Sequence, residues 1–216
     1  SGTTVVLNSM VFASNLFVAV GELGTILTST NGTSWTRRTS GTADFLYDVS
    51  YGAGKYIAVS DTGTVVTSAN GVTWSARSAG TPSVFGVAYG NGKFVSVGGY
   101  TSCDFFFCFN YSVAYTSGTG VSWTQVNPGP GVYLSDLAFG NGIFVAVGEA
   151  GTILRSTDGV NWAPQSSGSA DFLLNIAFGD GTFVVVGSQQ GSILSSKDGI
   201  NWTPRNSGTS TGLFNV

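Results

Sequence analysis

One short block recurs five times along the chain and constrains the fold more than any other feature. It reads STNGTSW at 29–35, SANGVTW at 68–74, SGTGVSW at 117–123, STDGVNW at 156–162 and SKDGINW at 196–202. The closing tryptophans follow one another at spacings of 39, 49, 39 and 40 residues. A fixed period of this length is the signature of a repeat architecture. We expect one domain, 1–216, with repeat units at about 1–41, 42–80, 81–130, 131–168 and 169–208.

Each repeat unit reads as four short strands. The first is an alternating apolar run such as FLYDVSYG at 45–52, and the second is a run such as LFVAVG at 16–21. Asn-Gly pairs such as Asn91-Gly92 and Asn141-Gly142 separate these two strands, which is a strong hairpin signal. No helical period competes with the strand pattern. The fold class expected is therefore all-β, a β-propeller of four-stranded antiparallel blades, with five blades preferred.

The chain also carries a surplus strand. Residues 209–216 pass the last unit junction and supply part of the first strand of a further unit, while residues 1–13 already supply a first strand. Either the surplus strand helps to close a five-bladed ring, or the chain is a piece of a longer array. A surplus strand has unpaired backbone groups, so it is expected to lie elsewhere or to pair with a second molecule.

The recurring block predicts a tight turn between the third and fourth strands. Its Ser and its Asp or Asn are expected to bond turn backbone groups, its Gly supplies a positive φ, and its Trp packs at the blade edge. Because the block recurs in every unit, a structural role is preferred to a ligand contact. The residues given this role are Ser29, Trp35, Ser68, Trp74, Ser117, Trp123, Ser156, Asp158, Trp162, Ser196, Asp198 and Trp202.

The block resembles the Asp-box of the BNR, or sialidase-like, propellers, although it is one residue shorter. The surrounding pattern, as in GIFVAVGEAGTILRS at 142–156, is similar to bacterial propellers related to photosystem II assembly factors. This resemblance covers essentially the whole chain and implies the propeller fold. It implies little about function, because such blades occur in hydrolases, lectins, assembly factors and cell-surface proteins.

Composition excludes several classes of function. The chain has no His, which removes Ser-His-Asp catalysis and His-ligated zinc sites. It has only 8 Lys and Arg, so nucleic acid is not an expected partner. No apolar run is long enough to span a membrane. Sialidases need three arginines that converge on the central channel. Four of the five arginines here fall on fourth strands, which are outermost, so no enzyme is expected; they are Arg37, Arg38, Arg77 and Arg205.

The third unit carries the candidate binding site. Its loop between the second and third strands, GGYTSCDFFFCFNYS at 98–112, is about ten residues longer than in the other units. Insertions in one repeat mark a binding face. A Cys103–Cys108 disulfide is expected, and with it an oxidising, extracellular or cell-surface setting, taken as bacterial. The loop is expected either to bind a partner or to bury its Phe side chains against the blade. The candidate residues are Tyr100, Asp104, Phe105, Phe106, Phe107 and Tyr111.

Acidic residues suggest a second, weaker site. The loops between second and third strands carry Glu22, Asp61 and Glu149, and the inter-blade loops carry Asp44 and Asp171. The plain interpretation is a solvated rim. The alternative is binding of polyols or of Ca²⁺, which would be the only cofactor, because carboxylates suit both. Asp48, Asp136 and Asn175 share one position on first strands and are expected to hydrate a central channel or to contact a ligand.

These observations favour a non-catalytic, extracellular binding module. The first hypothesis is a lectin-like or adhesive propeller that binds carbohydrate or protein. The alternative is a structural or protein-docking segment of a larger bacterial surface or assembly protein. The lectin hypothesis predicts several equivalent weak sites that gain strength together. The docking hypothesis predicts a single site that depends on residues 105–107.

Overall fold

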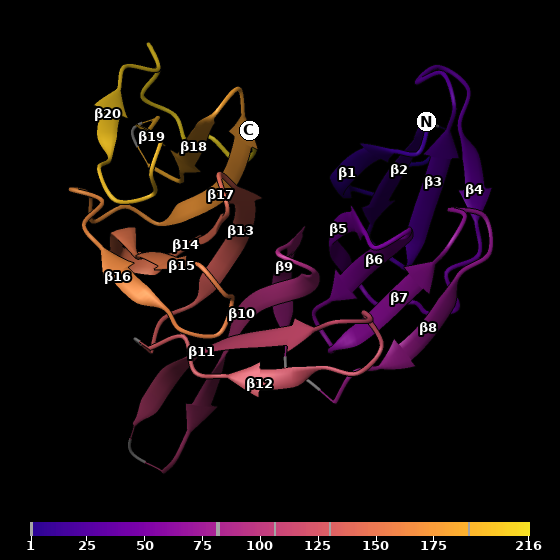
Figure 1. The fold of residues 1–216 in the computed structure, drawn as a ribbon, viewed down its shortest axis with the longest axis horizontal. Coiled ribbons are helices and arrows are strands. Elements are labelled where there is room, and N and C mark those ends of the chain that lie inside the picture. The colour runs from indigo at the N-terminus through magenta and orange to yellow at the C-terminus, as the bar shows by residue number, and fades with distance from the viewer. Residues whose placement is uncertain (1, 81–82, 106, 130, 190) are drawn as a thin grey trace. The chain divides into compact units, whose positions relative to one another are not determined.

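The predicted four-stranded unit is confirmed five times. A computed structural model describes residues 2–80, 83–105, 107–129, 131–189 and 191–216. Its strands form five antiparallel four-stranded sheets, which are the blades of a β-propeller (Figure 1). Within the described ranges the only helical element is η1 (Glu149–Gly151), a single 3₁₀ turn.

The strand bounds follow the repeat. Blade 1 consists of β1 (Leu7–Ala13), β2 (Leu16–Gly21), β3 (Thr25–Ser29) and β4 (Thr36–Arg38). Blade 2 consists of β5 (Leu46–Gly52), β6 (Lys55–Ser60), β7 (Thr64–Ser68) and β8 (Ser75–Ser78). Blade 3 consists of β9 (Val84–Gly90), β10 (Lys93–Cys103), β11 (Cys108–Ser117) and β12 (Thr124–Val126). Blade 4 consists of β13 (Leu134–Gly140), β14 (Ile143–Gly148), β15 (Ile153–Ser156) and β16 (Ala163–Gln165). Blade 5 consists of β17 (Leu173–Gly179), β18 (Thr182–Gly187), β19 (Ile193–Ser196) and β20 (Thr203–Arg205).

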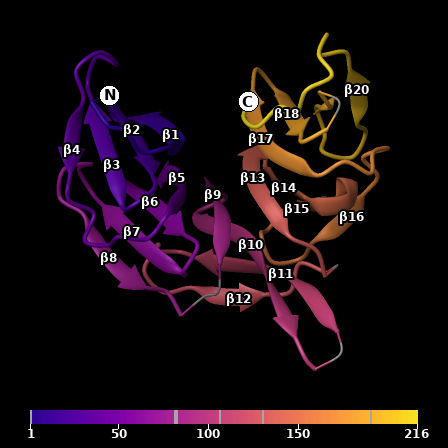
Figure 2. The same cartoon turned by 180° about the vertical axis from the view of Figure 1, so that it is seen from behind.

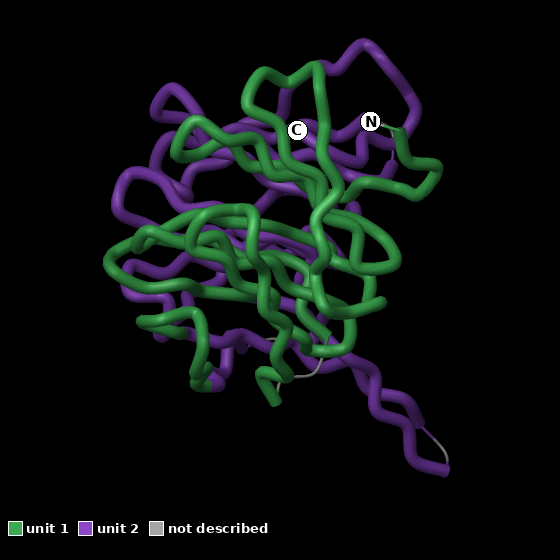
Figure 3. The backbone as a smooth tube through the Cα atoms, turned by 90° about the vertical axis from the view of Figure 1, so that its right-hand side faces the viewer, with its two compact units in different colours: residues 1–96, 117–124 green, residues 97–116, 125–216 purple. Residues whose placement is uncertain are grey.

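The chain forms two compact units. Unit 1 comprises Ser1–Ser96 and Ser117–Thr124, and unit 2 comprises Val97–Thr116 and Gln125–Val216 (Figure 3). Blades 1 and 2 belong to unit 1, blades 4 and 5 belong to unit 2, and the strands of blade 3 are shared between them. The single domain suggested by the repeats stays a prediction.

The turns between first and second strands have the backbone that their sequence predicts. Asn91 and Gly92 have φ values of 47° and 77°, and Asn141 and Gly142 have 49° and 78°. Two successive positive φ values define the type I′ turn, whose twist matches that of the flanking strands. The turn sets the pairing of β13 with β14, in which Gly140 lies opposite Ile143 and Phe139 opposite Phe144.

The second and third strands supply the core. Val18 and Val20 of β2 pack with Ile26, Leu46 and Val66 in unit 1. In unit 2, Val145 and Val147 of β14 pack with Ile153, Leu173 and Val185. Several of these strands are buried on both faces, because blade packs on blade. Their sequences therefore read as apolar runs and not as alternating patterns.

The recurring block forms the predicted turn. In unit 2, the Ser156 hydroxyl accepts a hydrogen bond from the Gly159 N–H at 2.8 Å, and Asp158 Oδ1 accepts from Val160 and Asn161 N–H at 2.9 and 2.8 Å. In unit 1, Ser68 and Asn70 make the equivalent bonds. The block glycines have φ between 68° and 74°. These backbone bonds hold the pKa of Asp158 well below its usual range.

The same turn joins one blade to the blade before it. Gly71 of blade 2 lies directly over Leu16 of β2, so a Cβ at this position would overlap the Leu16 side chain. Gly199 of blade 5 lies over Ile143 and Val145 of β14, with contacts of 2.9 and 3.0 Å to a built Cβ. Glycine is therefore required here for two reasons, its positive φ and the close approach of the neighbouring blade.

These two reasons can be separated with a matched pair of variants. In Gly71→Ala the new Cβ sits on a residue with a positive φ and also overlaps Leu16. In Gly32→Ala the φ is similar, but the only side chain within 4 Å of the new Cβ is Phe17, at 3.8 Å. We expect Gly32→Ala to cost about 1–2 kcal/mol of unfolding free energy, from the backbone alone. Gly71→Ala should cost about 1–3 kcal/mol more, because its blade junction is overpacked. Urea unfolding of both variants measures the difference, and equal losses would contradict the packing role.

Candidate functional site

The polar residues on first strands link neighbouring blades. Asp136 Oδ1 accepts the Leu137 N–H of its own strand at 2.8 Å, and Oδ2 accepts the Ile176 N–H of blade 5 at 2.9 Å. The Asn175 amide also donates to Oδ2, at 2.8 Å. Asp136 is buried and these bonds connect β13 to β17. The arrangement is that of a structural link between blades, and a ligand contact at this position stays a prediction.

Asp48 repeats this arrangement in unit 1. Its Oδ1 accepts from Val49 N–H and from the Ser9 hydroxyl, and its Oδ2 accepts from Val87 N–H of blade 3 at 2.8 Å. Burial raises the pKa of Asp48, and the hydrogen bonds to Ser9, Val87 and Val49 oppose that rise. Both oxygens are occupied within the fold, so Asp48 also serves as a link between strands.

Asn175 holds the C-terminal segment. Its Oδ1 accepts a hydrogen bond from the Val216 N–H at 3.0 Å. This bond is equivalent to the one that Asp136 accepts from the Ile176 N–H. The Leu213 N–H donates to the Gly187 carbonyl at 2.9 Å. The surplus segment thus lies against blade 5 in the place that a following first strand takes.

The acidic loop residues mostly tie loops together. Asp44 Oδ2 accepts from the Thr62 hydroxyl at 2.7 Å, and hydrogen bonds from the Thr64 and Thr62 side chains lower the Asp44 pKa. Asp171 accepts from the Ser188 hydroxyl and from the Gln189 N–H, both at 3.0 Å. Glu149 Oε2 accepts from Tyr133 N–H and from the Asn110 amide. These three carboxylates accept hydrogen bonds that stabilise loops. Such bonds are compatible with the interpretation of the acidic loop residues as a solvated rim.

Glu22 and Asp61 lie in the same neighbourhood of unit 1. Burial is the main cause of the raised pKa of Tyr47, and the charges of Asp61 and Glu22 raise it further. Among the residues whose placement is described, no three His, Cys, Asp or Glu side chains form a group that could hold a metal ion. Calcium binding by Glu22, Asp61 and Glu149 stays a prediction.

The insertion in blade 3 is a long hairpin and not a loop. β10 and β11 run for 11 and 10 residues, beyond the length of the corresponding strands elsewhere, and Figure 3 shows this hairpin extending from the rest of unit 2. The predicted Cys103–Cys108 disulfide closes its end, with an S–S distance of 2.05 Å. The inserted residues extend the ladder because alternating pairs such as Tyr100 and Tyr111 continue the strand pattern; these two rings stack at 5.1 Å.

Two phenylalanine rings are exposed to solvent at the tip of the hairpin. The Phe107 N–H donates to Asp104 Oδ1 at 2.8 Å, and the Asp104 N–H donates to the Phe107 carbonyl at 2.9 Å. Phe105 is fully exposed and Phe107 is 66% exposed. Phe106 lies outside the described residues. The alternative that Phe105 and Phe107 fold back and bury themselves on the blade is therefore wrong.

The base of the hairpin is anchored to blade 4. The Thr101 and Tyr133 hydroxyls lie 2.6 Å apart, and the Thr101 hydroxyl donates to Asn110 Oδ1 at 2.9 Å. Asn110 in turn donates to Glu149. Sequence reasoning missed Thr101, Asn110 and Tyr133, since nothing in a single sequence indicates that residues this far apart meet. The contacts at the base and the disulfide at the tip hold the two strands of this hairpin together; Figure 2 shows it from behind the view of Figure 1.

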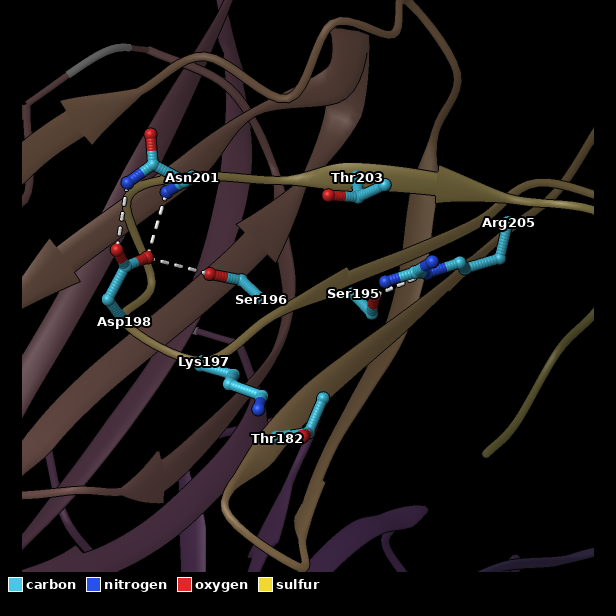
Figure 4. A pocket seen from close by; sticks show the side chains of 8 residues that line it. All are labelled: Thr182, Ser195, Ser196, Lys197, Asp198, Asn201, Thr203 and Arg205. Carbon is cyan, nitrogen blue, oxygen red and sulfur yellow. Dashed lines mark hydrogen bonds between the residues drawn. The ribbon is translucent and has the colours of Figure 1, made fainter.

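Two cavities were also missed. One of about 660 Å³ lies beside the loop between blades 1 and 2 and is lined by residues 37–43 with Leu23 and Gly24. The other, of about 340 Å³, lies on blade 5 and includes Thr182, Ser195, Lys197 and Arg205 in its lining (Figure 4). In Figure 4 the Arg205 side chain reaches Ser195, with Nε 2.8 Å from the hydroxyl, while Asp198 turns toward Ser196 and Asn201.

The arginines lie where the sequence predicts. Arg37 and Arg38 are on β4, Arg77 on β8 and Arg205 on β20, which are fourth strands, and Arg155 is on the third strand β15. No helix in the described parts of the chain is long and apolar enough to cross a membrane.

Comparison with known proteins identifies the fold. No protein-family model and no curated protein sequence matches the chain. Among solved structures, YCF48 bound to D1 peptide is 20% identical with a TM-score of 0.64, over 92% of this chain and 66% of that one. The nidogen–laminin complex gives 10% identity and a TM-score of 0.69, over 98% and 84% of the two chains. Streptogramin B lyase gives 9% identity and a TM-score of 0.76, over 93% and 68%.

These similarities show the propeller fold. Because the chain spans about two thirds of the YCF48 chain, and because all identities are low, they do not carry over an activity. The propellers similar to this chain include a peptide-binding protein, YCF48, and an enzyme, streptogramin B lyase. Function must therefore be argued from the side chains of this chain.

The link made by Asp136 can be tested directly. Asp136→Ala leaves the N–H groups of Leu137 and Ile176 and the Asn175 amide without their acceptor, so we expect a loss of about 2–4 kcal/mol in unfolding free energy. Asp180→Asn, at an exposed turn of the same unit, is the control and should change stability by less than about 0.5 kcal/mol. Urea unfolding, followed by circular dichroism, measures the unfolding free energy of both variants. An Asp136→Ala variant as stable as the unchanged protein would contradict the structural role.

Proposed function

We propose that this chain is a non-catalytic protein-interaction module whose contact site is the blade 3 hairpin. One observation carries the proposal: Phe105 and Phe107 are exposed at a tip closed by the Cys103–Cys108 disulfide. Exposed aromatic rings lose contact with water when a partner covers them, at about 25 cal/mol per Å² of apolar area. Aromatic side chains dominate the energy of protein interfaces.

The rigidity of the hairpin supports this assignment. A partner that binds a flexible loop must order it, and that ordering reduces the net binding free energy. Here the disulfide, the bonds between Asp104 and Phe107, and the contact of Thr101 with Tyr133 already order the backbone. Two of the structural neighbours, YCF48 with its D1 peptide and nidogen with laminin, are complexes with a peptide or protein, which agrees with an interaction role for this fold.

The setting proposed is an oxidising one. The disulfide points to a location outside the cytoplasm, because disulfides persist in oxidising compartments. A bacterial cell surface or a secreted parent protein is consistent with it. The blade turns carry five copies of a block that resembles the Asp-box, although it is one residue shorter, and this resemblance supports a BNR-type propeller as the subtype. Catalysis is not proposed, since the arginines lie mainly on fourth strands and the acidic residues of the first strands are engaged in links between blades.

The hairpin proposal predicts which side chains bind. Peptides selected from a random display library against the whole chain should lose at least tenfold in affinity, about 1.4 kcal/mol, when Phe105 and Phe107 are both changed to Ser. Val121→Ser, an exposed apolar position on another turn, is the control and should bind as the unchanged protein does. Isothermal titration calorimetry measures each dissociation constant. Equal affinity for all three proteins, or failure to select any peptide, would contradict the proposal.

Carbohydrate binding is a second candidate function. The cavity of about 660 Å³ beside residues 37–43 has a size suited to a small ligand and lies at a loop between blades, where a lectin-like propeller has its sites. The Arg37 and Arg38 side chains and backbone groups of residues 39–43 line it.

A glycan array screened with calcium and with a chelator tests this second candidate. Binding of a related set of sugars, lost in an Arg37→Ala variant, would support it. Loss with chelator would show that the binding needs calcium, for which Glu22, Asp61 and Glu149 are the candidate ligands. An array with no bound sugar in either condition would exclude carbohydrate as the ligand.

A further inference from the structure

The blade 3 hairpin carries an aromatic face along both of its strands. Tyr100 of β10 stacks on Tyr111 of β11, with ring centroids 5.1 Å apart and an angle of 15° between the ring planes. Phe109, two residues before Tyr111 on β11, lies on the same side, because side chains alternate along a strand. The Phe107 ring is 6.4 Å from the Phe109 ring and continues the row. The aromatic face therefore consists of Tyr100, Phe107, Phe109 and Tyr111, all of them exposed.

The opposite face of the hairpin is occupied by its anchor to blade 4. Thr101 and Asn110, which alternate with the aromatic residues, bond to Tyr133 and Glu149 of that blade. The aromatic rings therefore lie on the side away from these contacts. All of these residues belong to unit 2, so the arrangement is internal to that unit.

The unit that carries the hairpin is acidic. Unit 2 holds seven acidic and three basic residues, a net charge of −4, whereas unit 1 holds four acidic and five basic residues, a net charge of +1. No Lys or Arg occurs between Lys93 and Arg155, a stretch that includes the hairpin tip and its anchor on blade 4. Asp104 lies at the tip, where its Oδ1 accepts the Phe107 N–H. A negative charge therefore adjoins the aromatic face, in a segment without a basic residue.

Aromatic rings and a carboxylate together favour a cationic partner. The faces of Phe and Tyr rings carry partial negative charge, so a cation within about 6 Å of a ring centroid is attracted to the ring. Arginine fits best, because its planar guanidinium stacks on aromatic rings while its N–H groups bind a carboxylate. A neutral apolar peptide would cover the rings but would leave the negative charge of the hairpin without a counterpart.

We propose that the partner of the hairpin is a basic protein segment whose arginine side chain stacks on the aromatic face. The guanidinium stacks on Phe107 and Phe109 and pairs with the Asp104 carboxylate at the tip. This inference rests on the proposed function, because it names the chemistry of the partner that the same hairpin binds. The net charge of unit 2 also speeds the approach of such a segment, since complementary charge steers association.

Three versions of each peptide test the role of arginine. Peptides are selected from a random display library against the whole chain, and those that lose affinity in the Phe105→Ser, Phe107→Ser double variant are kept, since these bind the hairpin. Each is prepared unchanged, with lysine in place of arginine, and with citrulline, which has nearly the same shape but no charge. We expect arginine in the kept peptides, and citrulline should lower their affinity at least tenfold by isothermal titration calorimetry. Lysine should lower it by less, about threefold, because it keeps the charge but not the planar group.

Two variants of the hairpin test the aromatic face and the carboxylate separately. Phe109→Leu keeps an apolar side chain but removes the ring, and Asp104→Asn keeps the oxygen that accepts the Phe107 N–H but removes the charge. Each should weaken binding of the arginine peptide about threefold to tenfold and leave the citrulline peptide within about twofold. Asp180→Asn removes the same charge at an exposed turn elsewhere in unit 2. This control should bind both peptides as the unchanged protein does.

Three outcomes would overturn the inference while the hairpin remains the binding site. The kept peptides could contain no arginine, or they could bind equally well with citrulline, and either result would identify a neutral partner. Phe109→Leu and Asp104→Asn could also leave the affinity for the arginine peptide unchanged. If no selected peptide depends on Phe105 and Phe107, the proposed function itself fails, and this inference fails with it.

Discussion

The packing of one blade on the next governs the rest of this structure. A four-stranded blade has two faces, and its second and third strands are apolar on both, so a single blade cannot shield them from water. The block turn resolves this by placing a glycine against the preceding blade, as Gly71 does on Leu16 and Gly199 on Ile143. Each repeat is therefore stabilised by its neighbours, as in other repeat architectures.

This dependence gives the acidic residues on first strands a structural role. A carboxylate has two oxygens that accept several hydrogen bonds, and a link between adjacent strands from different blades needs such an acceptor. Asp48 and Asp136 fill that need, and Asn175 does so for the C-terminal segment. The loop carboxylates Asp44, Asp171 and Glu149 are similarly engaged. The polar residues that recur with the repeat therefore have structural roles in it.

The functional candidate is instead the part that departs from the repeat. The hairpin of β10 and β11 is longer than its counterparts in the other blades, its tip exposes Phe105 and Phe107, and its base is tied to Tyr133 and Glu149. An apolar tip on a rigid base has no evident value for folding, because it removes no apolar surface from water. Under the proposed function, a bound partner would give those rings the burial that the fold does not.

Periodicity alone determined the four strands of each unit and the tight turns at Asn91-Gly92 and Asn141-Gly142, and it favoured five blades. The disulfide was predicted from the two cysteines, Cys103 and Cys108, which lie close together in the inserted segment. These features depend on residues close together in sequence, where spacing and backbone preference decide the outcome. Only the tertiary structure decided that Asp48 and Asp136 link blades and that the insertion is a hairpin with an exposed tip. Those features depend on which distant residues meet, and a single sequence holds no direct record of such contacts.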